Sequence, residues 1–424
     1  MDKFVIQGPA ALEGSIRISG SKNASLPMYA AAILAREQPL VLDNIPRLRD
    51  VFTMLEVLGV LGVESNWTDE HTVSLDATGG IAETAPYELV RKMRASVNVL
   101  GPLLARLGQA RVSLPGGCAI GTRPVDLHLK GLAALGAVID VEHGYIVARA
   151  DKLRGARINL LGANGPSRGA TANVLMAAVL AEGVTVIEGA AREPETADLC
   201  NLLNAMGADI EGIGESTLTI HGVASLNGVE YPVMSDTIEA GTYIAAAGIT
   251  RSKFVLENCP TAMMEPINSV FTRAGIRLQE LDDGRLSVDG TDGLRPVEAR
   301  TAPWPGFPTD MQAQLMAMCC LAPGISVFTE SIYPDRFMHV PELVRLGALI
   351  TRDTATAIVH GVAGLQGAHV MATDLRASAA LVLAGLAAQG ETQVLRVYHL
   401  DRGYEGMELK LQALGADVRR VSED

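Results

Sequence analysis

The sequence predicts an α/β protein built from six copies of one unit of about 70 residues. The first observation is a recurring helix end, where a small-residue turn centred on glycine precedes a short strand. The six glycines are Gly62, Gly136, Gly207, Gly275, Gly347 and Gly415, which lie 74, 71, 68, 72 and 68 residues apart. Glycine directly after the last helical residue is a common helix stop. This period is too long for a common solenoid repeat, so the copies indicate larger α/β domains.

The second observation is a further helix upstream of that turn, which is rich in small residues. The clearest helices are expected over 170–182, 311–321 and 377–389, and strands over 184–188 and 392–397 follow two of them. Helices such as 311–321 show no evident polar face, which predicts that they are buried inside a ring of sheets.

The third observation is the length of 424 residues, which favours more than one domain. Six units divide as three plus three, with a turn-rich break at 227–232. The opening strand over 4–7 is expected to complete the sheet of the other domain, which makes Ser19–Ser21 a second crossing. The predicted domains are therefore 22–231, and 1–21 together with 232–424. Two crossings side by side would form a hinge, with a cleft between the domains.

Composition limits the partners and the compartment. Lys and Arg number 35 against 48 Asp and Glu, so the net charge of −13 disfavours nucleic acid or an anionic membrane as a general partner. An anionic ligand would need a local basic cluster. The N-terminal sequence lacks a signal pattern, and no uncharged apolar run reaches about 18 residues, so we expect a soluble cytoplasmic protein.

The five cysteines show no CxxC spacing and are odd in number. This argues against a zinc site and against a disulfide framework. Cys200, Cys259, Cys319 and Cys320 have apolar neighbours and are expected in the core, whereas Cys118 does not.

The segment 115–126 combines a nucleophilic thiol at Cys118, three glycines, and a cation at Arg123 close to the carboxylate of Asp126. Glycines let the backbone approach a ligand, and a Gly-rich loop contributes no core, so the segment indicates chemistry. The alternative is an ordinary surface turn with a spare cysteine.

The expected starts of the small-residue helices carry residues that favour N-capping. The predicted caps are Ser21, Ser167, Ser235, Thr309 and Thr373, and the acids Asp236, Asp310 and Asp374 fall in the first turn as the helix dipole favours. The cations Lys22, Arg94, Arg168 and Arg376 oppose the dipole at corresponding positions. A bound phosphate or carboxylate would reverse that penalty. The alternative is that they are solvated side chains, and Arg123, Arg336 and Arg402 are further candidates.

Seven blocks in order resemble the enolpyruvyl transferase family, in the branch that uses UDP-N-acetylglucosamine. The blocks are 21–23, 115–128, 191–195, 307–314, 336–342, 371–378 and 398–405. The resemblance implies two inside-out α/β barrel-like domains, each of three βαβαββ-type units, with the active site in the interdomain cleft. It also implies transfer of the enolpyruvyl group of phosphoenolpyruvate to the sugar 3-hydroxyl with release of phosphate, in peptidoglycan synthesis, without a cofactor or metal.

The resemblance assigns roles to residues. Cys118 would be the acid and the thiol that can add to C2 of phosphoenolpyruvate, which implies sensitivity to fosfomycin, and Asp310 would be the base. The phosphoenolpyruvate cage would consist of Lys22, Arg123 and Arg402, with Arg94, Arg336 and Asn23 beside it. The UDP-N-acetylglucosamine site would include Asn23, Arg94, Arg123, Pro124, Val125, Asp126, Leu127, Ser167, Arg168, Gly169, Asp310 and Ile332.

Two other functions compete with this one. Enolpyruvyl transfer to shikimate 3-phosphate would use the same architecture and cage, but that family has no cysteine-bearing loop of this kind. A non-catalytic nucleotide-sugar-binding paralogue would need neither the acid Cys118 nor the base Asp310. The sequence departs from the family pattern at Gly165, Asn98 and Thr237, which bears on nucleotide affinity and not on the reaction class.

Overall fold

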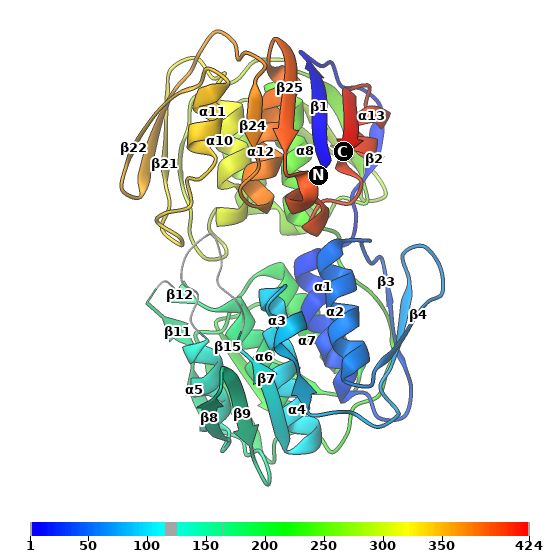
Figure 1. Cartoon of the computed structure of the whole chain (residues 1–424). Helices are drawn as coiled ribbons and strands as arrows, with labels where there is room; N and C mark the ends of the chain where they lie inside the picture. Colours follow the sequence, from blue (N-terminus) through cyan, green and yellow to red (C-terminus); the bar gives the residue numbers. More distant parts are fainter. Residues whose placement is uncertain (1, 115–124, 164, 423–424) are drawn as a thin grey trace. The chain divides into compact units, whose positions relative to one another are not determined.

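The structure is a computed structural model that describes residues 2–114, 125–163 and 165–422 (Figure 1). Within these ranges the chain divides into two compact units, each described by itself. Unit 1 comprises residues 2–19 and 235–422, and unit 2 comprises residues 20–114, 125–163 and 165–234. The chain therefore crosses between units after residues 19 and 234, where the sequence predicted crossings after residues 21 and 231.

Unit 2 contains three four-stranded mixed sheets with one pairing pattern. In each sheet the first two strands are parallel and the other neighbours are antiparallel. The orders are β16 (Glu230–Pro232), β3 (Leu40–Asp43), β5 (Val73–Asp76), β4 (Glu64–Trp67); β6 (Thr84–Ala85), β7 (Gln109–Ser113), β9 (Tyr145–Arg149), β8 (Val138–Glu142); and β10 (Arg157–Asn159), β13 (Val184–Glu188), β15 (Thr217–His221), β14 (Asp209–Glu211). Strands β11 (Leu161–Gly162) and β12 (Gly165–Pro166) form a further pair.

The helices of unit 2 form an inner and an outer set. The inner helices are α1 (Lys22–Ala31) with η1 (Ala32–Leu34), η2 (Arg94–Val99) with α4 (Leu100–Leu107), and α6 (Arg168–Ala178). They pack against one another, and most of their residues are buried. The outer helices are α2 (Arg49–Val60), α5 (Asp126–Ala134) and α7 (Pro194–Ala205), with the short α3 (Tyr87–Val90) before η2.

Unit 1 repeats the same sheet pattern three times. The orders are β2 (Ser15–Arg17), β17 (Lys253–Glu257), β19 (Leu286–Asp289), β18 (Arg277–Glu280); β20 (Glu298–Arg300), β21 (Ile325–Thr329), β23 (Thr356–His360), β22 (Leu349–Asp353); and β24 (His369–Met371), β25 (Gly390–Leu395), β1 (Asp2–Gly8), β26 (Asp417–Ser422).

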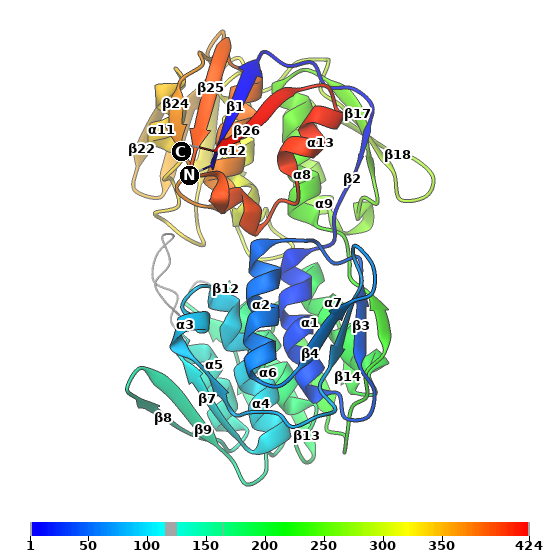
Figure 2. The same ribbon diagram turned by 45° about the vertical axis from the view of Figure 1, so that its right-hand side comes forward.

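The inner helices of unit 1 are buried more completely than those of unit 2. They are α8 (Thr237–Ile249), η4 (Thr309–Met311) with α10 (Gln312–Cys319), and α12 (Leu375–Ala387). All of α8 and α10 is buried, and the three helices pack pairwise, with β1 and β25 covering α12 (Figures 1 and 2). The outer elements are η3 (Thr261–Met263), α9 (Glu265–Arg273), α11 (Val340–Arg345), η5 (Val397–Arg402) and α13 (Met407–Ala413). The prediction that the helix near 311–321 is buried is confirmed.

The six predicted glycine turns are all present. Each glycine follows the end of an outer helix, and its φ lies between 92° and 110°. A side chain is strained in this left-handed region, which explains why glycine recurs there.

Two sheets are completed by strands from distant parts of the sequence. Strand β1 pairs with β25 and β26 and completes a sheet of unit 1, so the prediction for residues 4–7 is confirmed. The expected break at 227–232 instead ends in β16. Pro232 fits there because β16 is an edge strand, where a missing N–H is tolerated.

Two of the predicted N-caps are correct. The hydroxyls of Ser21 and Ser167 accept hydrogen bonds from the backbone N–H three residues later, at 3.3 Å in both cases. These caps fix the first turns of α1 and α6, which carry Lys22 and Arg168.

Three predicted N-caps are wrong. Ser235 and Thr373 lie one residue too early, because the following carboxylates of Asp236 and Asp374 each accept two backbone N–H groups of the first turn. A charged acceptor binds these amides more strongly than a hydroxyl does. Thr309 lies inside η4, and its hydroxyl donates elsewhere.

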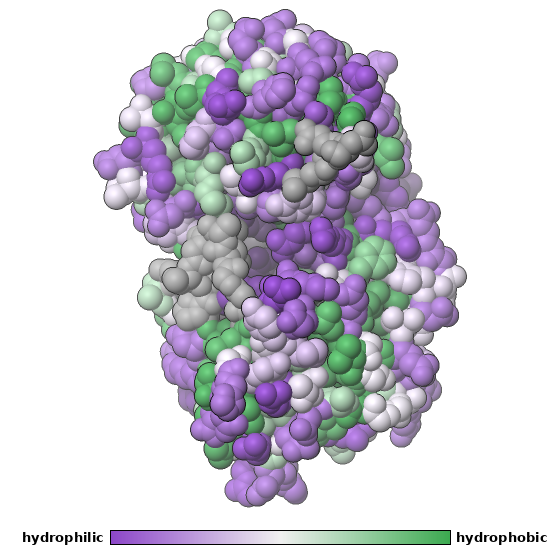
Figure 3. Space-filling view, viewed as in Figure 1, coloured by the Kyte–Doolittle hydropathy of each residue, from purple (hydrophilic) through white to green (hydrophobic). Residues whose placement is uncertain are grey.

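Each unit has its own hydrophobic core. Cys200, Cys259, Cys319 and Cys320 are buried, as predicted. On the face shown in Figure 3, hydrophilic side chains alternate with small hydrophobic areas. Among the described residues, the helices are too short or too polar to cross a bilayer.

Candidate active site

In unit 2 the inner helices begin with cations, and the first turns of the outer helices contain acids. The first residues of α1, η2 and α6 are Lys22, Arg94 and Arg168, and the first turns of α2, α5 and α7 contain Asp50, Asp126 and Glu195. Lys22 Nζ lies 3.4 Å from Asp50 Oδ2, and Arg168 Nη1 lies 3.5 Å from Glu195 Oε1. Each acid interacts favourably with the dipole of its own helix, and Asp50 and Glu195 also offset the charge of the cations beside them.

The burial of Lys22 decides between the two explanations for this cation. Its side chain is only 12% exposed, so Lys22 is not a solvated side chain on an exposed helix end. A partly buried ammonium at a helix N-terminus is electrostatically costly unless anions compensate it. Asp50 supplies one negative charge, and a phosphate or carboxylate ligand would supply more.

A buried histidine at the start of α5 connects this helix with α6 and η2. The amide nitrogen of Asn173 donates to His128 Nδ1 at 3.0 Å and to the carbonyl of Val97 at 2.9 Å. Burial and, to a smaller extent, the charge of Arg94 together lower the pKa of His128 to about 4, so the ring is neutral at neutral pH. A Cβ at Gly169 would lie 3.1 Å from the ring, which explains why glycine follows Arg168.

The other predicted residues of unit 2 are placed as follows. Val125 caps the start of α5, whose first two residues are Asp126 and Leu127, and Leu127 packs against Gly162. Asn23 is the second residue of α1. Cys118, Arg123 and Pro124 lie outside the described residues.

In unit 1 the carboxylate of Asp310 is bound by two arginines. Arg336 Nη1 donates to Oδ1 at 2.7 Å, and Arg376 Nη2 donates to Oδ2 at 3.2 Å. The side chains of Arg336 and Arg376 are 7% and 4% exposed, and that of Asp310 is 20% exposed. Two guanidinium groups therefore fix a carboxylate that still reaches solvent, which suits a group that must accept a proton from a ligand.

Arg376 itself lies among polar groups of the inner helices and next to Tyr404. Burial alone would lower its pKa, but Tyr404, Asp310 and Asp236 raise the pKa above the usual value for arginine. The Tyr404 hydroxyl lies 2.9 Å from Thr242 Oγ1 and also accepts from Gln314, which donates to the backbone carbonyl of Asp310. Asp310 is therefore positioned through both its backbone and its side chain.

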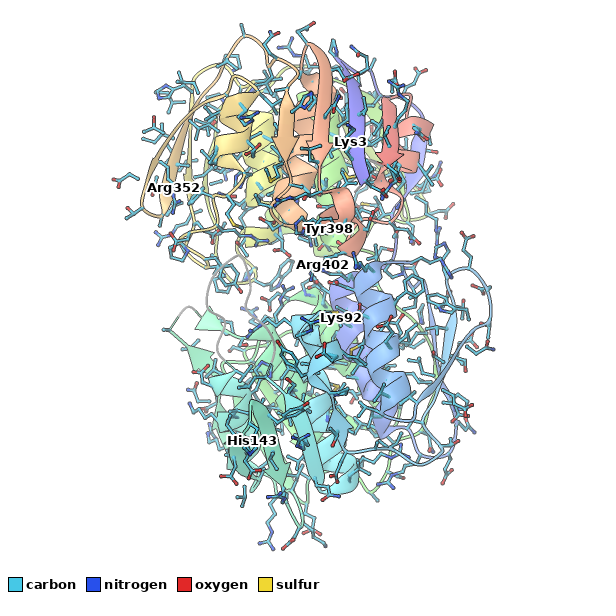
Figure 4. All side chains as sticks on the ribbon, viewed as in Figure 1. Lys3, Lys92, His143, Arg352, Tyr398 and Arg402 are labelled. Carbon is cyan, nitrogen blue, oxygen red and sulfur yellow. The ribbon has the colours of Figure 1, made fainter. Side chains whose placement is uncertain are left out.

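Arg402 is the last residue of the short helix η5, which also contains Tyr398 (Figure 4). Its neighbour Asp401 accepts from Arg420 at 2.5 and 3.1 Å, and Arg420 Nε donates to Glu408 at 2.7 Å. These hydrogen bonds hold η5 against β26. Arg420 was missed by the sequence analysis, because nothing in a strand sequence indicates a partner 19 residues away.

Glu330 was also missed. It is buried directly after β21, and its Oε1 accepts from the backbone N–H of Ile332 at 2.8 Å. A charged residue next to the apolar strand 325–329 was the available signal. The predicted residues thus divide into Asp310, Ile332, Arg336 and Arg402 in unit 1 and the described remainder in unit 2.

Comparisons with known proteins identify the family of the chain. A family model described as EPSP synthase (3-phosphoshikimate 1-carboxyvinyltransferase) matches residues 6–411. The enolpyruvyl transferase NikO from Streptomyces tendae superposes with a TM-score of 0.91 at 28% identity, covering 100% of this chain and 99% of that chain. An EPSP synthase from Acinetobacter baumannii has a TM-score of 0.79 at 18% identity over 100% of both chains, which shows the fold alone. The chain therefore belongs to the EPSP synthase family of enolpyruvyl transferases.

Curated relatives show to which branch of this family the chain is similar. The UDP-N-acetylglucosamine 1-carboxyvinyltransferase of Desulfovibrio desulfuricans is 55% identical over 423 residues, and that of Dichelobacter nodosus is 52% identical over 423 residues. Both alignments cover 100% of each chain. Within the family, this chain groups with the UDP-N-acetylglucosamine 1-carboxyvinyltransferases.

Proposed function

We propose that this protein transfers the enolpyruvyl group of phosphoenolpyruvate to the 3-hydroxyl of UDP-N-acetylglucosamine and releases phosphate, in the first committed step of peptidoglycan synthesis. The observation that carries this proposal is the identity of 55% over the full length of a relative named for that activity. The fixed, partly exposed carboxylate of Asp310 supports it, because an acceptor hydroxyl must lose a proton.

Phosphoenolpyruvate brings a phosphate and a carboxylate, so its site must be cationic. Lys22, Arg123 and Arg402 bind these groups, with Asn23, Arg94 and Arg336 beside them. Lys22 is suited to this role because it is mostly buried at the N-terminus of α1, and a helix N-terminus favours an anion. Cations in such a site stabilise negative charge that develops during the reaction.

The chemistry needs one acid and one base. The sugar hydroxyl adds to C2 of phosphoenolpyruvate while Asp310 accepts its proton and an acid protonates C3. Phosphate then leaves C2 as a proton is removed from C3, which restores the double bond in the product. Cys118 is the acid, and its thiolate is also the nucleophile that can add to C2.

The nucleotide sugar binds to a set drawn from both units. The set comprises Asn23, Arg94, Arg123, Pro124, Val125, Asp126, Leu127, Ser167, Arg168, Gly169, Asp310 and Ile332. We further propose that residues 22–231 and residues 1–21 with 232–424 act as two inside-out barrel-like domains, with the substrates in the cleft between them. Support comes from the repeated sheet pattern of the units and from the division of the site residues.

A phosphate-release assay tests the proposal. Purified protein is given phosphoenolpyruvate with UDP-N-acetylglucosamine or with shikimate 3-phosphate, and product is identified by mass spectrometry. We expect release only with the nucleotide sugar. Release with shikimate 3-phosphate alone would assign the sister reaction. Binding of the nucleotide sugar without any turnover would instead indicate a non-catalytic paralogue.

A further inference from the structure

One position recurs in the repeated sheets, directly after the second strand of the parallel pair. At this position Asn44, Gly189, Asn258 and Arg396 have a φ between 55° and 64°. The amides of Asn44 and Asn258 donate to the backbone carbonyl that follows the neighbouring parallel strand, at 2.8 and 3.0 Å. A side chain at this position therefore links the ends of two parallel strands.

Glu330 occupies this position after β21 and makes different contacts. Its side chain is buried, with 1% of the residue exposed. Oε1 accepts from Thr301 Oγ1 at 2.7 Å and from the backbone N–H groups of Ile332 and Tyr333 at 2.8 and 3.0 Å. Oε2 accepts from Thr309 Oγ1 at 2.8 Å. Four donors on one buried carboxylate satisfy its need for hydrogen bonds.

These contacts connect two loops that carry proposed site residues. Strands β20 and β21 are parallel neighbours, so the loops that follow them leave the sheet at one edge. The Thr309 hydroxyl, which donates to Glu330, also accepts from Arg336 Nη1 at 3.1 Å, and Thr309 directly precedes Asp310. One oxygen of Glu330 thus supports the Asp310 loop, and the other supports the Ile332 loop.

We propose that Glu330 is a positioning residue that sets the Asp310 carboxylate in register with the Ile332 loop, which receives the nucleotide sugar. This inference rests on the proposed function. A neutral side chain of similar size cannot accept from all four donors, so the two loops would lose their common anchor. A shift of about 1 Å in a catalytic group is enough to cost roughly a hundredfold in rate.

The test compares Glu330→Ala with Asn258→Ala, which removes the equivalent link in a repeat that carries none of the proposed site residues. Both variants are expected to unfold at lower temperature, because each loses buried or partly buried hydrogen bonds. Only Glu330→Ala should lower kcat by about tenfold or more and raise KM for UDP-N-acetylglucosamine by about fivefold or more. Asn258→Ala should leave both within about twofold.

Glu330→Gln provides the conservative variant. Its amide oxygen can still accept from Ile332 and Tyr333, so KM for the nucleotide sugar should return to within about threefold of wild type. The affinity of the nucleotide sugar, measured by calorimetry without phosphoenolpyruvate, should follow the same order across the variants.

Two results would overturn the inference: kinetics of Glu330→Ala that match wild type, or an equal kinetic loss in Asn258→Ala. If Glu330→Ala is unfolded at the assay temperature, Thr301→Val decides, since it removes one of the four donors. An unchanged KM in Thr301→Val would then refute the inference. Failure of the proposed function is separate, because it appears in the wild-type protein as an absence of turnover with UDP-N-acetylglucosamine.

Discussion

Replacing Asp310 with asparagine removes one negative charge from between two nearly buried guanidinium groups. Asparagine keeps an oxygen that can accept from Arg336, which now donates to Oδ1 at 2.7 Å. Its NH2 group would then face Arg376 Nη2, which now donates to Oδ2 at 3.2 Å. Asp310→Asn therefore exchanges two hydrogen bonds between ionised groups for one hydrogen bond from an ionised donor to a neutral amide oxygen, and for a contact between two donors.

The contacts of Asp310 give a magnitude for the loss of stability and for the loss of activity. A hydrogen bond to a charged group contributes about 1.5–3 kcal/mol, and Asp310→Asn removes one of the two, so the exchange should cost about 1.5–3 kcal/mol of unfolding free energy. Because the Asp310 side chain is 20% exposed, water weakens these charge interactions, and we expect a loss of about 2 kcal/mol of unfolding free energy. Loss of a general base should lower kcat by about 10²–10⁴.

The two effects are measured separately. Urea unfolding gives the stability, and phosphate release at saturating substrates gives kcat. The control is Asp292→Asn, which breaks an exposed ion pair of the same type with Arg277 in unit 1, now 2.7 Å long. That variant should leave both quantities close to wild type, since exposed ion pairs contribute little.

Either half of the reasoning can fail by itself. Turnover of Asp310→Asn within about threefold of wild type would refute the assignment of Asp310 as the base. An unchanged unfolding free energy would show that the contacts with Arg336 and Arg376 do not stabilise the fold.

Three further predictions concern unit 2. A Cβ at Gly101 would lie 2.1 Å from a backbone carbonyl oxygen of α6, so Gly101→Ala should lower the unfolding free energy in urea by about 3 kcal/mol. A Cβ at Gly59 in α2 would meet no atom within 4 Å, so the control Gly59→Ala should raise the unfolding free energy by about 0.5–1 kcal/mol. His128 has a folded pKa of about 4, below the unfolded value of 6.5, so its stabilisation is complete above pH 6.5 and is lost as pH falls toward 4. Between pH 7.5 and 5 this amounts to about 2 kcal/mol, and His128→Gln should show a correspondingly smaller loss of unfolding free energy. Lys22→Ala should lower turnover with phosphoenolpyruvate by about tenfold or more, because a charge-assisted contact contributes about 1.5–3 kcal/mol. The control Lys92→Ala, which breaks an exposed ion pair with Glu56, should match wild type. Equal losses of turnover in the two lysine variants would argue against the anion site.

The helix caps show where the sequence was ambiguous. Serine or threonine directly precedes aspartate at 235–236 and at 373–374, and both types favour the N-cap position. The sequence analysis chose the hydroxyls, whereas the structure starts each helix one residue later. Which of two adjacent caps is used depends on where the preceding strand ends, and that is a tertiary property.

The sequence by itself determined the local and periodic features of this protein. Six glycines at a fixed spacing predicted six helix ends, because only glycine adopts a positive φ there without strain. Helices without a polar face predicted burial, since such a helix has no surface suited to water. The family blocks predicted Lys22 and Asp310 as site residues, and their roles remain proposals.

The tertiary structure decided which distant side chains support these residues. Arg376 contacts Asp310 across 66 residues, and Glu330 contacts Thr301 across 29 residues, with no periodic pattern that links either pair. Arg420 reaches Asp401 only because the chain between them folds back as α13 and β26. Such contacts depend on how strands and helices pack, and a buried charge finds its partner through that packing rather than through sequence spacing.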